Sequence, residues 1–163
     1  MIFAEIEAFA AALPRTGAVA GLDLGTKTIG VAVSDGLRAI ATPLVTIRRK
    51  KFTADAAELD GILAGREIAG LILGLPRNMD GSEGPRAQST RAFARNLDAR
   101  APRPLAFWDE RLSTVAAERA LLEADTTRKR RGEVIDHVAA SYILQGALDR
   151  MGRIGARADD DYD

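Results

Sequence analysis

The sequence contains no cysteine, and none of its apolar runs approaches the ~20 residues that a membrane-spanning helix needs. The lack of cysteine excludes a disulfide framework and a thiolate metal site, and it fits a reducing cytoplasm. Residues 1–13 are rich in alanine but carry Glu5 and Glu7 and no Lys or Arg, which argues against a signal peptide. We therefore expect a cytoplasmic protein that does not bind a membrane.

The chain also has no net charge, with 23 Lys and Arg against 23 Asp and Glu. Nucleic-acid binding rests largely on phosphate neutralisation, so the distribution of charge is the informative quantity. Residues 48–51 form one cationic block, whereas residues 159–163 are mostly Asp. A second block consists of Arg128, Lys129, Arg130 and Arg131. Either block could be a solvated loop, but a phosphate drawn to the second would lie near the helix that follows it.

A chain of 163 residues, 47% of them hydrophobic, is most simply one domain with a single core. Residues 1–18 are expected to form an extension with a short helix and a linker, residues 19–150 the main domain, and residues 151–163 a disordered acidic tail. Strands are expected at 19–25, 29–33, 40–47, 69–75 and 104–108, and helices at 53–63, at 86–97, after a cap at Ser113 or Thr114, and at 133–151. This order is typical of an α/β protein with helices packed on a mixed sheet.

An acidic residue, Asp23, interrupts a β-rich run, where Asp is usually depleted. The flanking runs surround a Gly-Thr-Lys-Thr turn, which predicts a β-hairpin. Alternation places Leu22 and Leu24 on one face and Asp23 with Gly21 and Gly25 on the other. Glycine weakens a strand interior, and its presence here is typical of close approach by a ligand or another backbone. An ordinary Asp near a turn is the alternative.

A second carboxylate, Asp136, falls on the apolar side of the last predicted helix. At ~100° per residue it shares that side with Ala139, Ala140 and Ile143. An unpaired carboxylate there would be costly, so a cation or strong donors should lie opposite. The alanines would let the helix approach a sheet closely. An Asp that only stabilises the first helical turn through the helix dipole is the alternative.

The strand predicted at 104–108 is followed by two acidic residues, Asp109 and Glu110. Ligand-binding groups gather at such strand ends in open α/β sheets, but alternation alone does not choose between the two, and an ordinary loop is also possible. With Asp23 and Asp136, one more carboxylate would complete an all-oxygen site suited to Mg²⁺ or Mn²⁺. Two such ions about 4 Å apart could activate a water and stabilise the leaving oxygen of a phosphodiester.

Four motifs follow one another along the chain, at residues 21–27 (GLDLGTK), 74–85 (GLPRNMDGSEGP), 109–114 (DERLST) and 135–140 (IDHVAA). In this pattern the chain resembles the YqgF-type family of RNase H-like proteins, which are described as pre-16S ribosomal RNA nucleases and as Holliday junction resolvases. The resemblance covers about residues 19–148. It implies an RNase H-like fold, with a mixed five-stranded sheet flanked by helices. It also implies that Asp23, Glu110 and Asp136 are the catalytic, metal-binding triad.

The resemblance further implies a nuclease that processes the 5′ end of pre-16S rRNA in ribosome biogenesis, with resolution of branched DNA as the alternative. The partner is then nucleic acid, and the chain could act as a monomer or a homodimer. Predicted nucleic-acid contacts are Lys27, Arg86, Arg91 and Arg111, together with the second cationic block. The loop at 76–84 is expected to face the substrate, and the single histidine, His137, to be structural.

Two other classes fit part of the pattern. Residues 23–26 also resemble the first phosphate motif of actin-like ATPases and sugar kinases, but those proteins enclose a nucleotide between two such domains and this length provides one. A nucleic-acid-binding module that keeps the fold without useful turnover is the second alternative. Absence of ATP binding would exclude the first class. Metal-dependent cleavage that is lost on changing Asp23 would exclude the second.

Overall fold

A computed structural model describes the backbone of residues 1–112 and 128–160 and, in the last helix, the side chains of residues 136–157. A six-stranded mixed sheet forms its centre, in the order β1-β6-β5-β2-β3-β4. The strands are β1 (Ile2–Phe3), β2 (Ala18–Leu24), β3 (Thr28–Ser34), β4 (Ala41–Arg48), β5 (Ile68–Leu75) and β6 (Leu105–Asp109). The first hairpin, β2 with β3, and the next pair, β3 with β4, are antiparallel, whereas β2, β5, β6 and β1 run parallel.

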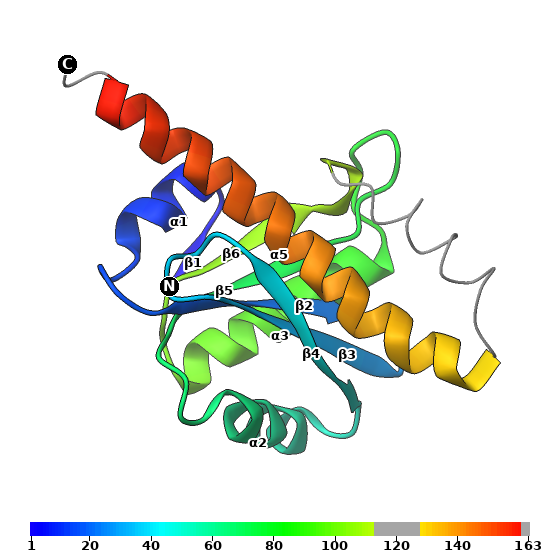
Figure 1. The fold of residues 1–163 in the computed structure, drawn as a ribbon. Coiled ribbons are helices and arrows are strands. Elements are labelled where there is room, and N and C mark those ends of the chain that lie inside the picture. The colour runs from blue at the N-terminus through cyan, green and yellow to red at the C-terminus, as the bar shows by residue number, and fades with distance from the viewer. Residues whose placement is uncertain (113–127, 161–163) are drawn as a thin grey trace.

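Helices cover both faces of the sheet. The long helix α5 (Arg128–Asp160) crosses one face diagonally, with α1 (Ile6–Ala12) beside its second half, while α2 (Phe52–Leu63) and α3 (Pro85–Arg100) lie on the other side (Figure 1). A short 3₁₀ helix, η1 (Glu110–Leu112), follows β6 directly. No helix among the described residues is both long and apolar enough to cross a membrane.

The central strand β5 shows how the sequence builds two cores from one sheet. Its run IAGLILGL is buried from Ala69 onward, as expected for a strand covered on both faces. Leu71 and Leu73 pack into the cluster that faces α2 and α3, whereas Ile72 packs into the cluster that faces α1 and α5. Alternate side chains of one strand therefore pack into two separate apolar layers, one on each face of the sheet.

The five predicted strands and the helices predicted at 53–63 and 86–97 are confirmed with small shifts at their ends, but the sheet has six strands rather than five. The additional strand, β1, is only two residues long and pairs with β6 through Ile2 and Phe3. A segment so short carries no periodic signal. The helix of the N-terminal extension is confirmed as α1. A smaller difference concerns α2, which begins at Phe52 with Lys51 at its N-cap, so Thr53 lies inside the helix.

The C-terminal helix departs most from the prediction. It begins at Arg128 rather than near residue 133 and continues to Asp160, so residues 151–160 are helical and not a disordered tail. Met151 and Ile154 explain the extension, because both pack against the cluster that contains Ile6. The second cationic block is accordingly the first turn of α5. The helix predicted after Ser113 or Thr114 lies outside the described residues.

Candidate metal centre and nucleic-acid contacts

Asp23 lies near the end of β2 and is almost fully buried, with 3% of its surface exposed. Its neighbours Leu22 and Leu24 belong to the core cluster on the α2 and α3 side, so Asp23 points to the α5 side. Across the hairpin it pairs with Gly30. On its other flank, β5 runs parallel with Leu73 opposite Leu22, which places Gly74 next to Asp23 one step further along. The carboxylate therefore has a glycine on each neighbouring strand.

These two glycines open space for the other acidic residues. A Cβ atom on Gly30 would lie 1.9 Å from the backbone oxygen of Asp136, which is far inside van der Waals contact. A Cβ atom on Gly74 would lie 2.8 Å from Oε1 of Glu110. The backbone of α5 therefore rests directly on β3 beside Asp23, and the Glu110 side chain extends over β5 on the opposite flank of Asp23.

Asp136 is fixed by the strand that it crosses. Its Oδ2 atom accepts a hydrogen bond of 2.6 Å from the hydroxyl of Thr28 in β3. The next residue, His137, places Nδ1 3.0 Å from Oγ1 of Thr46 in β4. Both contacts anchor this part of α5 to the antiparallel half of the sheet. The interpretation of His137 as a structural residue agrees with this contact.

The geometry separates Asp109 from Glu110, which alternation could not do. Asp109 accepts hydrogen bonds from the guanidinium of Arg111, with Nη2 at 2.6 Å from Oδ2, and Nη1 of Arg77 lies 3.8 Å from the same oxygen. The hydrogen bond from Arg111, with a smaller contribution from the charge of Arg77, lowers the pKa of Asp109. Asp109 is thus held in an ion-pair cluster. Glu110, half-buried at the start of η1, lies over Gly74 instead.

The three predicted carboxylates come from β2, η1 and α5 and approach the same glycine-lined part of the sheet. Their chemistry suits a hard divalent cation, because all the donors are carboxylate oxygens. In the arrangement described, however, no three His, Asp or Glu side chains among residues 1–112 and 136–157 stand close enough to hold one ion. The donor set and the glycine cradle fit a metal, provided that the side chains close on it.

Two of the predicted nucleic-acid contacts are engaged within the protein. The guanidinium of Arg91 makes hydrogen bonds of 2.5 and 2.8 Å to the two carboxylate oxygens of Glu83 and lies 4.9 Å from the ring centroid of Phe107. This bonding lowers the pKa of Glu83. Arg111 is occupied by Asp109 in a similar way. Both arginines therefore brace loops around the candidate site.

The loop at 76–84 is closed by its own hydrogen bonds. The backbone N–H of Asn78 donates to the carbonyl of Ser82 at 2.9 Å, and Oδ1 of Asp80 accepts from the backbone N–H of Ser82 at 2.9 Å. Its tip lies against η1, since Nη1 of Arg111 is 3.5 Å from the carbonyl oxygen of Met79. Met79 is 93% exposed. This loop therefore borders the element that carries Glu110.

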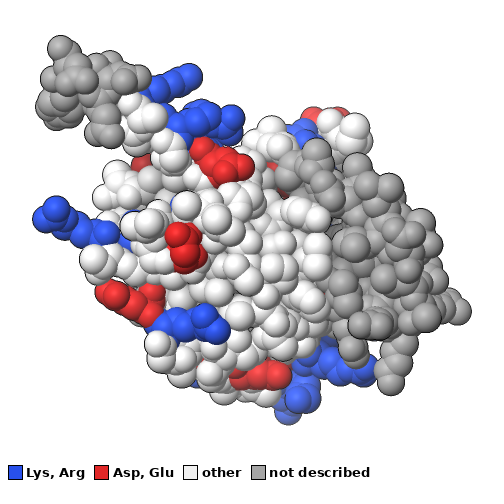
Figure 2. All heavy atoms as spheres, viewed as in Figure 1, with Lys and Arg blue, Asp and Glu red and all other residues white. Residues whose placement is uncertain are grey.

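The remaining predicted contacts lie near the ends of β2 and α5. Lys27 is exposed in the turn of the first hairpin, and exposed Arg86 stands in the first turn of α3. The cationic block at 128–131 precedes Asp136 by five to eight residues, roughly 7–12 Å along the helix axis. Its side chains lie outside the described part of the structure. Figure 2 shows several Lys and Arg side chains at the lower edge of the α5 face, around a central area that is mostly uncharged.

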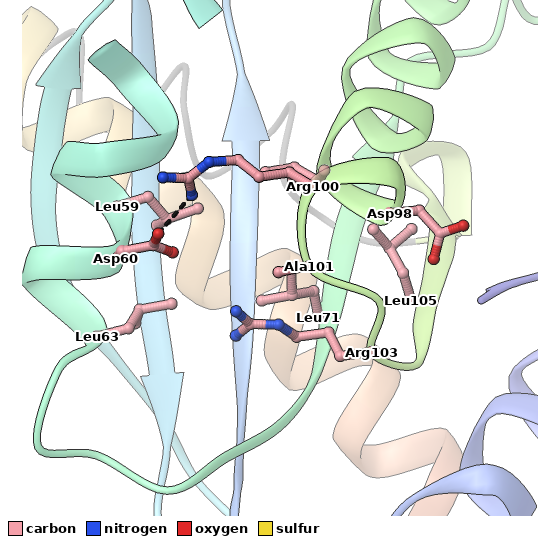
Figure 3. Close-up of a pocket in the computed structure, with 10 residues that line it drawn as sticks. Leu59, Asp60, Leu63, Leu71, Asp98, Arg100, Ala101, Arg103 and Leu105 are labelled. Atoms are coloured by element: carbon pink, nitrogen blue, oxygen red, sulfur yellow. Dashed lines mark hydrogen bonds and ion pairs between the residues drawn. The ribbon is translucent and has the colours of Figure 1, made fainter. Parts of the chain in front are cut away.

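A pocket between α2 and α3 is separate from the candidate metal centre. Its lining combines leucines, including Leu59 and Leu97, with charged residues at the ends of the two helices, and it holds only about 10 Å³, roughly the space of one water molecule. An ion pair between Asp60 and Arg100 bridges the two helices at its mouth (Figure 3). We interpret this pocket as part of the packing between helices.

The fold defines the class of protein first. A solved structure described as "T. thermophilus RuvC in complex with Holliday junction substrate" matches 83% of this chain and 96% of its own, with a TM-score of 0.50 and 14% identity. At that identity the match shows the fold alone, and the fold is RNase H-like. The sequence then gives the family. Residues 17–150 match the family described as "RuvX: Holliday junction resolvase", and the chain belongs to this family.

Three relatives are similar over nearly the whole chain, and all are named "Putative pre-16S rRNA nuclease". The relatives from Cereibacter sphaeroides, Paracoccus denitrificans and Rhodobacter capsulatus are 76%, 75% and 72% identical over 155 residues. Each match covers 95% of this chain and 97% or 98% of the relative. The family resemblance predicted from the four motifs is confirmed.

Proposed function

We propose that this chain is a metal-dependent nuclease that hydrolyses phosphodiester bonds in the cytoplasm, and that it trims the 5′ end of the 16S rRNA precursor. The observation that carries the chemistry is the approach of Asp23, Glu110 and Asp136 to one glycine-lined part of the sheet from three separate elements. The names of the relatives support the choice of RNA as substrate.

Each acidic residue has a distinct part in this proposal. Asp23, the most buried, would be the central ligand of Mg²⁺ or Mn²⁺, while Glu110 and Asp136 would close on the ion from either side. The hydrogen bond from Thr28 to Oδ2 orients the carboxylate of Asp136. An ionised carboxylate has about four lone-pair sites, so both of its oxygens keep acceptor capacity for a ligand. A bound divalent ion supplies charge stabilisation and an activated water for attack on phosphorus.

A second candidate function is cleavage of branched DNA. The description of the matched family and the RuvC-like fold favour it. The same carboxylates could serve either substrate, because the chemistry at phosphorus hardly differs while the binding surface does. Substrate choice therefore has to be decided by a direct comparison.

The deciding experiment compares pre-16S rRNA fragments with four-way DNA junctions, side by side, in Mg²⁺, Mn²⁺ and EDTA. We expect cleavage of the RNA in either metal, no cleavage in EDTA, and none by Asp23→Asn in any condition. Faster cleavage of the junction would favour the resolvase. Nucleic-acid binding without metal-dependent cleavage of either substrate would identify a non-catalytic module.

A further inference from the structure

A cleft lies at the end of β2, on the side of α3. It has a volume of about 160 Å³, and its walls include Leu24, Gly25 and Thr26 from the end of β2 and its turn, Arg49 after β4, and Arg86 and Ser89 from α3. No Asp or Glu is among the described residues that line it. Its polar side chains are two guanidinium groups and two hydroxyl groups, so the cleft is suited to an anion rather than to a cation.

Arg49 is held in position and still has donors to spare. Its Nη1 atom donates to the carbonyl of Gly25 at 2.7 Å, and its guanidinium lies 5.8 Å from the ring centroid of Phe93. The following residue is fixed as well, because the backbone N–H of Lys50 donates to buried Asp55 at 2.8 Å. A guanidinium has five N–H donors, and the contact with Gly25 uses one of them. The group is therefore preorganised, with donors left for a ligand.

Arg86 approaches the same cleft from α3. Its Nη2 atom lies 3.4 Å from the carbonyl oxygen of Leu24, a weak contact that leaves most of its donors available. Among the residues that the structure describes, neither Arg49 nor Arg86 forms an ion pair. Arginines elsewhere in the fold do form them, including Arg91 with Glu83 and Arg111 with Asp109. These two guanidinium groups are thus uncompensated positive charges.

The position of the cleft links it to the candidate metal centre. Leu24 and Gly25 are the first and second residues after Asp23, a distance of roughly 3–7 Å along an extended strand. Asp23 points to the α5 side of the sheet, whereas the cleft opens on the α3 side. A single nucleic-acid strand that passes around the end of β2 would therefore meet the carboxylates on one side and the arginines on the other.

We propose that Arg49 and Arg86, with the hydroxyls of Thr26 and Ser89, bind a backbone phosphate of the strand that is cut, next to the phosphate at the metal centre. This inference rests on the proposed nuclease function and gives it a subsite that positions the substrate. A guanidinium matches the geometry of a phosphate group and can donate two parallel hydrogen bonds to it. Arg49 and Arg86 are positioning residues in this scheme, because the reacting atoms lie on the other side of β2.

The test uses two pairs of variants on one helix. Arg86→Gln is matched by Arg95→Gln, an equal change of charge at another exposed position of α3. Ser89→Glu, which places a carboxylate in the cleft, is matched by Gln88→Glu at the neighbouring exposed position. The affinity for a single-stranded RNA is measured in EDTA at several salt concentrations, and thermal unfolding of each variant checks the fold.

Arg86→Gln should weaken RNA binding about tenfold relative to Arg95→Gln, as expected when a charged hydrogen bond is lost. Ser89→Glu should weaken it relative to Gln88→Glu because the new carboxylate repels the phosphate. The slope of log affinity against log salt should fall by about 0.7 for one lost contact with a single strand. Equal affinities and equal slopes within both pairs would overturn the subsite. Inorganic phosphate and a 5′-mononucleotide are tested alongside, and binding of either as tightly as RNA would instead indicate a small-anion site.

Because these measurements exclude metal, their outcome is separate from that of the nuclease proposal. A protein that binds RNA through the cleft but never cuts it would contradict the nuclease and leave the subsite standing. Cleavage that depends on Asp23, together with unchanged binding by Arg86→Gln and Ser89→Glu, would support the nuclease and exclude the subsite.

Discussion

The two faces of the sheet are covered in different ways. The face toward α2 and α3 is filled with large side chains, among them Leu22, Leu73 and Phe93. The face toward α5 carries Gly30 and Gly74 beneath the helix. Large side chains stabilise the first face by burying apolar area, at roughly 1.5–3 kcal/mol for each fully buried residue. The second face also has an apolar layer, but at Gly30 and Gly74 it lacks large side chains, and there the helix backbone comes close enough to bring Asp136 beside Asp23.

The largest effect should come from the carboxylates on the α5 face. Asp23→Asn, Glu110→Gln and Asp136→Asn should each reduce cleavage by orders of magnitude, because each removes a charged ligand of the proposed metal. The fold should remain, and the metal-free variants could even gain stability from reduced repulsion between carboxylates. Cleavage rates and thermal unfolding are measured together. Cleavage at the wild-type rate by any one variant would remove that residue from the site.

The next effect concerns the close approach of α5. Gly30→Ala should destabilise the protein by about 3 kcal/mol, the upper end of the range for overpacking, because its Cβ would meet the helix backbone rather than a movable side chain. Cleavage should fall as Asp136 is displaced. Gly36→Ala is the matched control, since a Cβ there meets nothing within 4 Å. Equal unfolding temperatures for the two variants would contradict the close approach.

Leu73→Ala provides the comparison on the opposite face. Leu73 is fully buried, so the substitution should cost about 2–5 kcal/mol, yet it should leave cleavage by the folded protein near the wild-type rate. Chemical denaturation gives the free energy of unfolding. Cleavage is measured at a temperature where Leu73→Ala and Gly30→Ala are both folded. If Leu73→Ala lost as much cleavage as Gly30→Ala, the α5 face would not have the special role in positioning the carboxylates that we infer for it.

A smaller effect is expected from metal binding to the native state. Adding Mn²⁺ to the metal-free protein should raise its unfolding temperature, because an ion that binds only the folded state stabilises it by about 2.7 kcal/mol at a hundredfold excess over the dissociation constant. The shift should shrink in Asp136→Asn and persist in Leu73→Ala. An identical shift in the wild type and in Asp136→Asn would exclude Asp136 as a ligand.

The two faces also differ in how far the sequence alone could predict them. Alternation in β2 was enough to place Asp23 away from Leu22 and Leu24, since that prediction needs only local geometry. The role of Gly30 was not predictable, because it depends on the register of the hairpin and on where α5 crosses it. Family resemblance, rather than pattern, chose Glu110 over Asp109, and the structure shows that Asp109 is paired with Arg111.

Arginine contacts were the least predictable feature. Arg91 and Arg86 are five residues apart on α3, and both were predicted to contact nucleic acid. Only the folded chain shows that Arg91 meets Glu83 while Arg86 lines an open cleft. An ion pair between a helix and a loop leaves no periodic trace in the sequence. The length of α5 was missed for a similar reason, because Met151 and Ile154 pack against partners near the other end of the chain.

The smallest expected effect is a pH dependence of stability that comes from the ion pair between Arg91 and Glu83. The hydrogen bond from Arg91 lowers the pKa of Glu83 in the folded state, so the stability that this pair contributes is present above the ordinary glutamate pKa of about 4.3 and is lost as the pH falls below it. Arg91→Gln removes this contribution, together with the pH-independent contact with Phe107. Unfolding temperatures of the wild type and Arg91→Gln should therefore differ most at neutral pH and draw closer below about pH 4.

Arg95→Gln, which breaks no ion pair in the described structure, should follow the wild type at every pH. Curves for the wild type and Arg91→Gln that stay parallel down to pH 3 would show that Glu83 is not stabilised by Arg91.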